Sequence, residues 1–205
     1  MAVTVVPQQR RPYPVVFLVD TSGSMADDGK IVVLNEALKG AISLLASIND
    51  PELELWCAII SFGSQAELRS GLAPIEQISL PPLQAKGSSV LGEALHELAK
   101  LFPSNSLPMV PHPPALVLIS DGQPTDEYQA TLSALEDNEW FRLSLRLAIR
   151  IGPDCDEKHL RSFTGAVSAV FTVSELVTLP DVMVRGARAI HNEMTLSSSS
   201  TLADT

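Results

Sequence analysis

The chain has 205 residues, of which 45% are hydrophobic and 19% charged, a balance typical of a globular domain with a substantial core. Aspartate and glutamate total 24 against 14 lysines and arginines, which gives a formal net charge of −10. A surface of this sign repels phosphate backbones and anionic lipids, so we expect neither nucleic acid nor a membrane as a partner.

Apolar runs and helical periodicities alternate along the chain. Residues 14–20 form a continuous apolar run that ends on an acid, which predicts a strand covered on both faces in a parallel sheet. In residues 30–48, apolar side chains recur every three or four positions and predict a helix with one buried face. The same patterns predict further strands at 55–62, 65–69, 115–120, 143–151 and 166–173, and further helices at 89–102, 125–137, 156–163 and 180–194.

Strands that alternate with helices imply right-handed crossovers and an open sheet. The predicted fold class is α/β: a Rossmann-like, doubly wound, mostly parallel sheet with helices on both faces and one short antiparallel edge strand. We expect one domain at residues 14–194, an N-terminal extension at 1–13 and a disordered serine-rich tail at 195–205.

Residues 141–150 alternate in a way that a strand buried on both faces should not. Three arginines are predicted on one side of this strand: Arg142, Arg146 and Arg150. Either the arginine face is only partly covered, or the arginines pair with acids of a covering helix, such as Glu136 and Asp137.

No segment has the pattern of a secretory signal or of a membrane span. The apolar run at residues 15–19 is far too short to cross a bilayer. Cys57 and Cys155 stand in no metal-ligand or redox spacing. We therefore expect a cytoplasmic protein with both thiols reduced, and an exposed Cys155 whose pKa is raised by neighbouring acids.

Polar side chains that can ligate a metal follow the strand at residues 14–20. In Asp20-Thr-Ser22-Gly-Ser24, alternate residues project the same way, so one carboxylate and two hydroxyls can converge. Such hard oxygen donors suit Mg²⁺, Mn²⁺ or Ca²⁺. A helix N-cap would use the same residue types, because Ser and Asp side chains accept hydrogen bonds from free helix amides.

Two further segments add hydroxyls and an acid at the same edge of the sheet. Ser88 and Ser89 open a predicted helix, and Asp121 follows the strand at 115–120. Ligands of doubly wound folds bind beyond the carboxyl ends of the strands, where Asp20 and Asp121 are both expected. An N-cap or an Asp-Gly turn would explain each segment alone, but the joint placement favours one metal site.

On these motifs, the stretch from about residue 14 to residue 194 resembles the von Willebrand factor A family, with its metal-ion-dependent adhesion site. The family's Asp-x-Ser-x-Ser loop matches Asp20, Ser22 and Ser24, and Asp121 in Leu-Ile-Ser-Asp-Gly matches its final acid. The resemblance implies a divalent cation, Mg²⁺ or else Mn²⁺ or Ca²⁺, with one coordination position open to a carboxylate from a protein partner.

Ser89 departs from the family's pattern while keeping a hydroxyl. It lies three residues before Gly92, at a position that is usually threonine, and Ser88 is the alternative ligand. The resemblance thus implies five metal-binding residues: Asp20, Ser22, Ser24, Ser89 and Asp121.

The same motifs look like those of bacterial TerY-type proteins from tellurium-resistance and stress clusters. The segments concerned are Lys-Gly-Ser-Ser-Val-Leu-Gly-Glu-Ala-Leu and Leu-Ile-Ser-Asp-Gly-Gln-Pro-Thr-Asp. This resemblance implies a protein kinase and a PP2C-type phosphatase as partners.

A metal-dependent hydrolase is the alternative interpretation. Aspartate-based phosphatases also place an acid after the first strand of a doubly wound fold, but they carry a second acid two residues later as proton donor. Here that position is Ser22, a poor general acid, and no lysine-bearing glycine-rich phosphate loop is present. The sequence therefore favours a protein-binding module that is not an enzyme.

Overall fold

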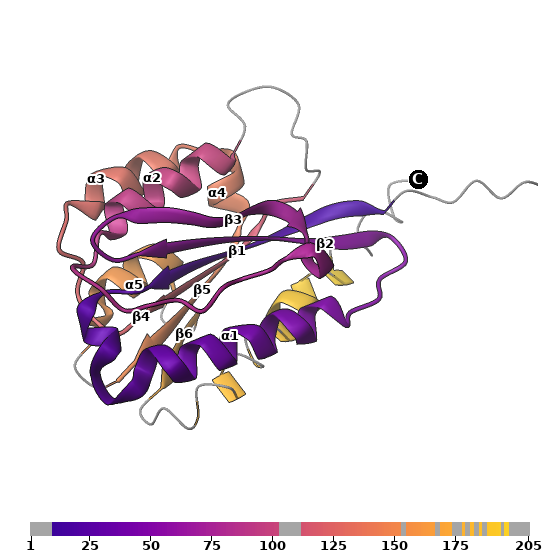
Figure 1. Cartoon of the computed structure of the whole chain (residues 1–205). Coiled ribbons are helices and arrows are strands. Elements are labelled where there is room, and N and C mark those ends of the chain that lie inside the picture. Colours follow the sequence, from indigo (N-terminus) through magenta and orange to yellow (C-terminus); the bar gives the residue numbers. More distant parts are fainter. Residues whose placement is uncertain are drawn as a thin grey trace, which may run out of the picture.

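The structure is a computed structural model, which describes residues 10–102, 112–152, 155–166, 169–173, 178, 181–182, 185, 188–193 and 195–196. A sheet with the strand order β3-β2-β1-β4-β5-β6 runs through the middle of the molecule, with helices on both faces (Figure 1). The parallel strands are β1 (Arg11–Asp20), β2 (Leu53–Phe62), β4 (Ala115–Ser120), β5 (Leu145–Ile151) and β6 (Val170–Val173). The edge strand β3 (Ala66–Pro74) pairs with β2 in the antiparallel sense. The predicted fold class is confirmed.

The helices divide into two layers. Their bounds are α1 (Lys30–Ala46), α2 (Leu91–Leu101), α3 (Tyr128–Glu136), α4 (Glu139–Leu143) and α5 (Glu157–Thr164), with short 3-10 turns η1 (Gly23–Gly29) and η2 (Ile75–Gln77). One layer is α1 with helical residues of the C-terminal part, including Val182 and Ile190; the other contains α2, α3, α4 and α5. None of the helices in the described part of the chain is long and apolar enough to cross a membrane.

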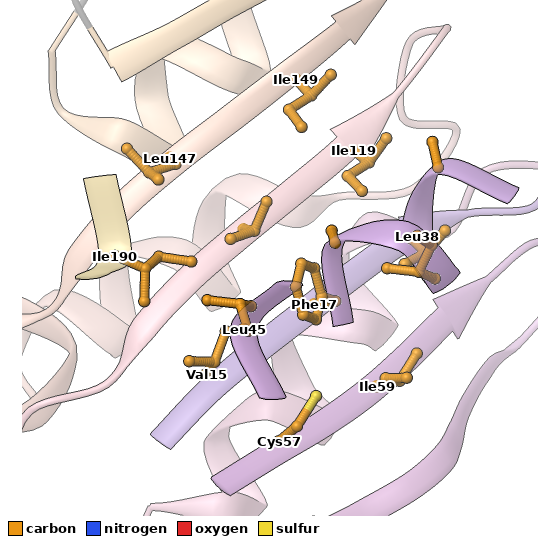
Figure 2. Packing of buried hydrophobic residues seen from close by; sticks show 14 of the residues in the cluster. Val15, Phe17, Leu38, Leu45, Cys57, Ile59, Ile119, Leu147, Ile149 and Ile190 are labelled. Atoms are coloured by element: carbon orange, nitrogen blue, oxygen red, sulfur yellow. The ribbon is translucent and has the colours of Figure 1, made fainter. Parts of the chain in front are cut away.

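The central strand β1 explains why its sequence does not alternate. Val15 and Phe17 pack into the layer that contains α1, while Val16 and Leu18 pack into the layer that contains α2. Figure 2 shows Phe17 beside Leu45 of α1 in the first of these layers. Because both faces are covered, every position from Val15 to Val19 is apolar, and the strand ends at Asp20.

The strand predicted at residues 143–151 begins only at Leu145, because the preceding residues form α4. Asn138 caps this helix by accepting hydrogen bonds from the backbone N–H groups of Trp140 (2.9 Å) and Phe141 (3.3 Å). Arg142 therefore lies on a helix, and its predicted place in the alternating strand is wrong.

The two remaining arginines of β5 pair with acids of the covering helices. Arg146 pairs with Glu136 of α3 at 2.5 Å, as the sequence suggested, and Arg150 pairs with Glu157 of α5 at 2.8 Å. The arginine face of the strand is thus covered.

Other boundaries shift by a few residues. The edge strand is longer than predicted and reaches Pro74, whereas α2, α3 and β6 begin two, three and four residues later than predicted, at Leu91, Tyr128 and Val170. The expectations for residues 1–9, 103–111 and 197–205 lie outside the described residues, while Thr195 and Leu196 are helical.

Candidate metal centre

The loops that follow β1, β2 and β4 meet at the carboxyl edge of the sheet, where residues 86–90 join them. The backbone of residues 86–90 lies against the loops that follow β1 and β2. The Lys86 N–H donates to the Thr21 carbonyl at 2.7 Å and the Gly23 N–H donates to the Gly87 carbonyl at 2.8 Å, while the Val90 N–H donates to the Gly63 carbonyl at 3.3 Å. Gly87 has a φ of +79°, and a Cβ there would come within 1.6 Å of the Ser64 hydroxyl. Only glycine fits this position, which brings the chain before α2 over the end of β1.

Asp20 lies at the bottom of this junction and is fully buried. One carboxylate oxygen, Oδ1, accepts a hydrogen bond from the Ser22 N–H at 2.8 Å. The other, Oδ2, accepts hydrogen bonds from the hydroxyls of Ser89 at 3.0 Å and Ser120 at 2.7 Å. Burial raises the pKa of the Asp20 carboxyl, and the nearby Asp121 raises it further, although the hydrogen bonds act in the opposite direction.

Asp121 lies on the facing side of the centre. Its Oδ1 accepts a hydrogen bond from the Ser24 hydroxyl at 2.8 Å, and the Ser24 and Ser22 hydroxyls are 3.1 Å apart. Its Oδ2 pairs with the ammonium group of Lys30 at 2.7 Å. Ser24 is exposed, so the centre opens to solvent on the Ser24 side.

The structure brings all five predicted metal-binding residues together and distinguishes the two candidate serines. Ser89 is buried and donates to Asp20, whereas Ser88 is exposed. Neither Ser22 nor Ser89 acts as a side-chain helix cap: the Ser22 side chain makes no capping bond to η1, and Val90, not Ser89, stands at the N-cap position of α2.

The donor set consists of oxygen atoms only. In the described ranges, no three His, Cys, Asp or Glu side chains gather to hold a metal ion, so an ion here would rest on two carboxylates and several hydroxyls. A buried aspartate with a raised pKa, beside a second buried aspartate, is an environment that a cation would stabilise. The residues therefore fit a hard divalent cation.

Sequence reasoning missed three contributors. The Ser120 hydroxyl orients Asp20, and Lys30 pairs with Asp121. Thr125 holds the backbone of Ser89 from both sides, because its N–H donates to the Ser89 carbonyl at 2.7 Å and its Oγ1 accepts from the Ser89 N–H at 3.2 Å. Ser120 and Thr125 flank Asp121 within Leu-Ile-Ser-Asp-Gly-Gln-Pro-Thr, which is the signal that could have found them.

Cys155 lies beside the centre, and the prediction of an exposed thiol is wrong. The residue is 3% exposed, and its Sγ lies 3.7 Å from the Ser120 carbonyl oxygen and 3.6 Å from that of Gly122. Burial raises the pKa of this thiol to about 12. Cys155 thus packs against the turn that carries Asp121, which excludes solvent from the sulfur.

Two acids on loops near this edge have structural partners. Asp126 accepts hydrogen bonds from the N–H groups of Gly92 (3.0 Å) and Glu93 (3.2 Å), at the start of α2. Asp156 caps α5 by accepting from the Lys158 N–H at 2.9 Å. Three further acids on loops near the centre, Asp27, Asp28 and Glu127, are exposed.

A doubly wound sheet with an oxygen-donor centre at the carboxyl ends of β1 and β4 defines the class to which this protein belongs. The family model described as von Willebrand factor type A domain matches residues 15–123, which span β1 to the turn after β4. The chain belongs to this family. Comparison with curated proteins gives no match.

Solved structures with the same fold come from distant relatives. A von Willebrand factor type A protein from Catenulispora acidiphila is 20% identical, with a TM-score of 0.67 over 88% of this chain and 43% of its own. The ArnB paralog VWA2 from Sulfolobus acidocaldarius is 22% identical, with a TM-score of 0.62 over 86% of this chain and 45% of its own.

A third structure is the proximal thread matrix protein 1 from the mussel byssus, with a zinc-occupied metal-ion-dependent adhesion site. It is 18% identical, with a TM-score of 0.66 over 90% of this chain and 47% of its own. The chain thus spans less than half the length of each of these proteins. At these identities the likeness shows the fold alone.

Proposed function

We propose that this chain is a divalent-cation-dependent protein-binding module. Five residues would hold one Mg²⁺ or Mn²⁺ ion: Asp20, Ser22, Ser24, Ser89 and Asp121. The observation that carries the proposal is their convergence, from three separate loops, around two buried carboxylates. The bound ion would supply a positive centre able to accept a carboxylate from a protein partner.

The residues of the chain prepare the centre for such an ion. The Ser22 N–H and the Ser120 hydroxyl orient the two oxygens of Asp20, so this carboxylate loses little further freedom when it binds a cation. The exposed Ser24 lies where a partner would enter. A zinc-occupied site of the same type in the mussel protein supports a divalent ion, while the oxygen-only donor set here favours Mg²⁺, Mn²⁺ or Ca²⁺ over zinc.

The alternative of a metal-dependent hydrolase lacks a proton donor at the expected position. Ser22 occupies the place where aspartate-based phosphatases carry their second acid, and its hydroxyl contacts that of Ser24. Type A domains are generally interaction modules and not enzymes, which supports the same choice. Hydrolysis of a generic aryl phosphate by the purified chain with Mg²⁺, abolished in Asp20→Ala, would favour the hydrolase.

We further propose a TerY-type role in a bacterial stress or tellurium-resistance system, with a protein kinase and a PP2C-type phosphatase as partners. The motifs around Ser89 and Asp121 are the basis of this proposal. We propose a cytoplasmic location, consistent with two free, buried cysteines, and domain limits at residues 14–194, with an extension at 1–13 and a tail at 195–205.

Isothermal titration with Mg²⁺ and Mn²⁺ tests the metal centre. We expect one site of modest affinity in the unmodified chain, because only two carboxylates contribute charge, and at least tenfold weaker binding by Asp20→Ala. The matched control is Asp27→Ala, which removes an exposed acid from the same connection between β1 and α1 and should leave binding unchanged. Equal binding by all three proteins would remove the proposed site.

Partner capture tests the open coordination position. Chelator should release a bound partner, and Ser24→Ala should weaken capture, if the partner supplies a carboxylate to the ion. A complex that resists both changes would place the interaction on another surface.

A further inference from the structure

Lys30 places a positive charge directly beside Asp121 in the centre. Its ammonium Nζ lies 2.7 Å from Asp121 Oδ2 and 3.4 Å from the carbonyl oxygen of Ser24. The Asp121 side chain has no exposed surface, while 19% of the Lys30 side chain is exposed. The ion pair therefore compensates a buried carboxylate through a side chain that still reaches solvent.

Lys30 is a basic residue at the start of a helix, where acidic residues are preferred. It is the first residue of α1, where the helix dipole and the free amides favour acids, yet the first turn of α1 contains none. Asp28 and Gly29 immediately before it both have positive φ angles, of 52° and 73°, which redirect the chain into the helix. A residue that opposes its local preference in this way often serves a site elsewhere.

Charge compensation at the centre is incomplete. Two buried carboxylates, those of Asp20 and Asp121, face one another across the serines, and among the ion pairs of the described residues only that of Lys30 reaches them. A divalent ion would compensate both acids, but the lysine charge beside Asp121 would repel it. The flexible four-carbon stem of lysine lets its ammonium group leave for solvent at modest cost.

We infer that Lys30 is a built-in competitor for the metal: its ammonium group occupies Asp121 in the metal-free protein, is displaced when a divalent cation binds, and so keeps the affinity for that cation low. This inference rests on the proposed metal-binding function. It assigns to Lys30 an influence on the centre that the five oxygen-donor residues do not explain.

Isothermal titration with Mg²⁺ and with Mn²⁺ distinguishes a Lys30 that competes with the metal from a Lys30 that only stabilises the fold. Lys30→Met should bind about tenfold more tightly than the unmodified chain, equivalent to ~1.4 kcal/mol. Lys30→Arg keeps the charge and should retain weak binding. The matched control is Lys39→Met, which removes an exposed charge from the same helix and should change affinity less than twofold.

A second measurement uses the unmodified protein, in case Lys30→Met fails to fold without its ion pair. Labelling of Lys30 by an amine-reactive reagent, followed by mass spectrometry, should become several-fold faster at saturating Mg²⁺, while labelling of Lys39 stays constant. Equal or weaker binding by Lys30→Met, or unchanged labelling at saturating Mg²⁺, overturns the inference and leaves the metal site standing. No binding by any variant overturns the proposed function and the inference with it.

Discussion

Asp20 illustrates how hydrogen bonds and charge compensation differ in a buried site. Three groups donate to its carboxylate, from Ser22, Ser89 and Ser120, yet burial still raises its pKa. Neutral donors orient the oxygens and recover part of the lost hydration, but they bring no net positive charge. A bound cation would supply the positive charge that these hydrogen bonds lack.

His159 of α5 should make stability depend on pH. Its ring is 2% exposed and lies edge-on to Tyr128, and burial lowers its pKa to about 4. In the unfolded chain the same histidine has a pKa near 6.5, so below that pH the unfolded state binds more protons than the folded state. The neutral His159 ring therefore contributes fully to the free energy of unfolding above pH ~6.5. This contribution is lost as the pH falls towards 4, by up to about 3 kcal/mol.

Urea unfolding of the unmodified chain and of His159→Phe at several pH values from 7.5 to 4.5 measures this contribution. The difference between the two proteins isolates His159 from Asp20 and His112, which titrate in both. We expect the variant to lose much less stability on acidification, because Phe keeps the ring packing and removes Nε2, for which the described residues provide no hydrogen-bond partner. Identical pH profiles would show that His159 does not titrate with unfolding.

At the scale of elements, the start of α2 depends on a residue that follows β4. Asp126 accepts two N–H groups of the first turn of α2, and a Cβ on Gly92 would lie 2.9 Å from the Asp126 carboxylate and 3.1 Å from the Tyr128 Cα. Glycine at position 92 thus allows the beginnings of α2 and α3 to touch. The same contact lies next to Ser89, which Thr125 holds in place.

Asp126→Ala should lower the free energy of unfolding by about 1–2 kcal/mol, the usual cost of losing a helix cap. The exposed neighbour Glu127 provides the control, and Glu127→Ala should change stability by less than ~0.5 kcal/mol. Urea unfolding monitored by circular dichroism gives both values. A loss in Asp126→Ala no larger than that of the control would show that other groups, or water, satisfy these amides equally well.

At the scale of the whole molecule, two hydrophobic layers share one sheet. Leu38 of α1 and Leu95 of α2 are fully buried on opposite faces. The alternate side chains of β1 belong to different layers, so loss of either layer exposes the central strand. The layers should therefore unfold together.

Leu38→Ala and Leu95→Ala should each lower the free energy of unfolding by about 2–5 kcal/mol, because each leaves a cavity in a closely packed layer. Both should unfold in a single transition by fluorescence and circular dichroism. Leu68→Ala, on the edge strand, removes a side chain that is 45% exposed and should cost clearly less. Separate transitions in either core variant would mean that the layers unfold independently.

The sequence by itself determined the class of fold and the edge that carries the candidate centre. The unbroken apolar run of β1 is stable only between two layers; Asp20 ends this strand, and Asp121 directly follows the similar strand β4. Strand ends of a parallel sheet meet at one edge, so proximity of these acids follows from chain order alone. The hydrophobic pattern of each segment and the direction of the strands were therefore sufficient to predict the fold class and the edge that carries the candidate centre.

Only the tertiary structure decided which groups complete the centre and which segments leave the predicted pattern. Lys30 reaches Asp121 across 91 positions of sequence, and Ser120 reaches Asp20 across 100. Residues 139–143 form a helix because Asn138 caps it, although their alternation suits a strand, and Cys155 is buried because it packs against the turn after β4. Periodicity records which face of an element is covered, but the partner of a single side chain depends on the path of the loops, which residue spacing does not encode.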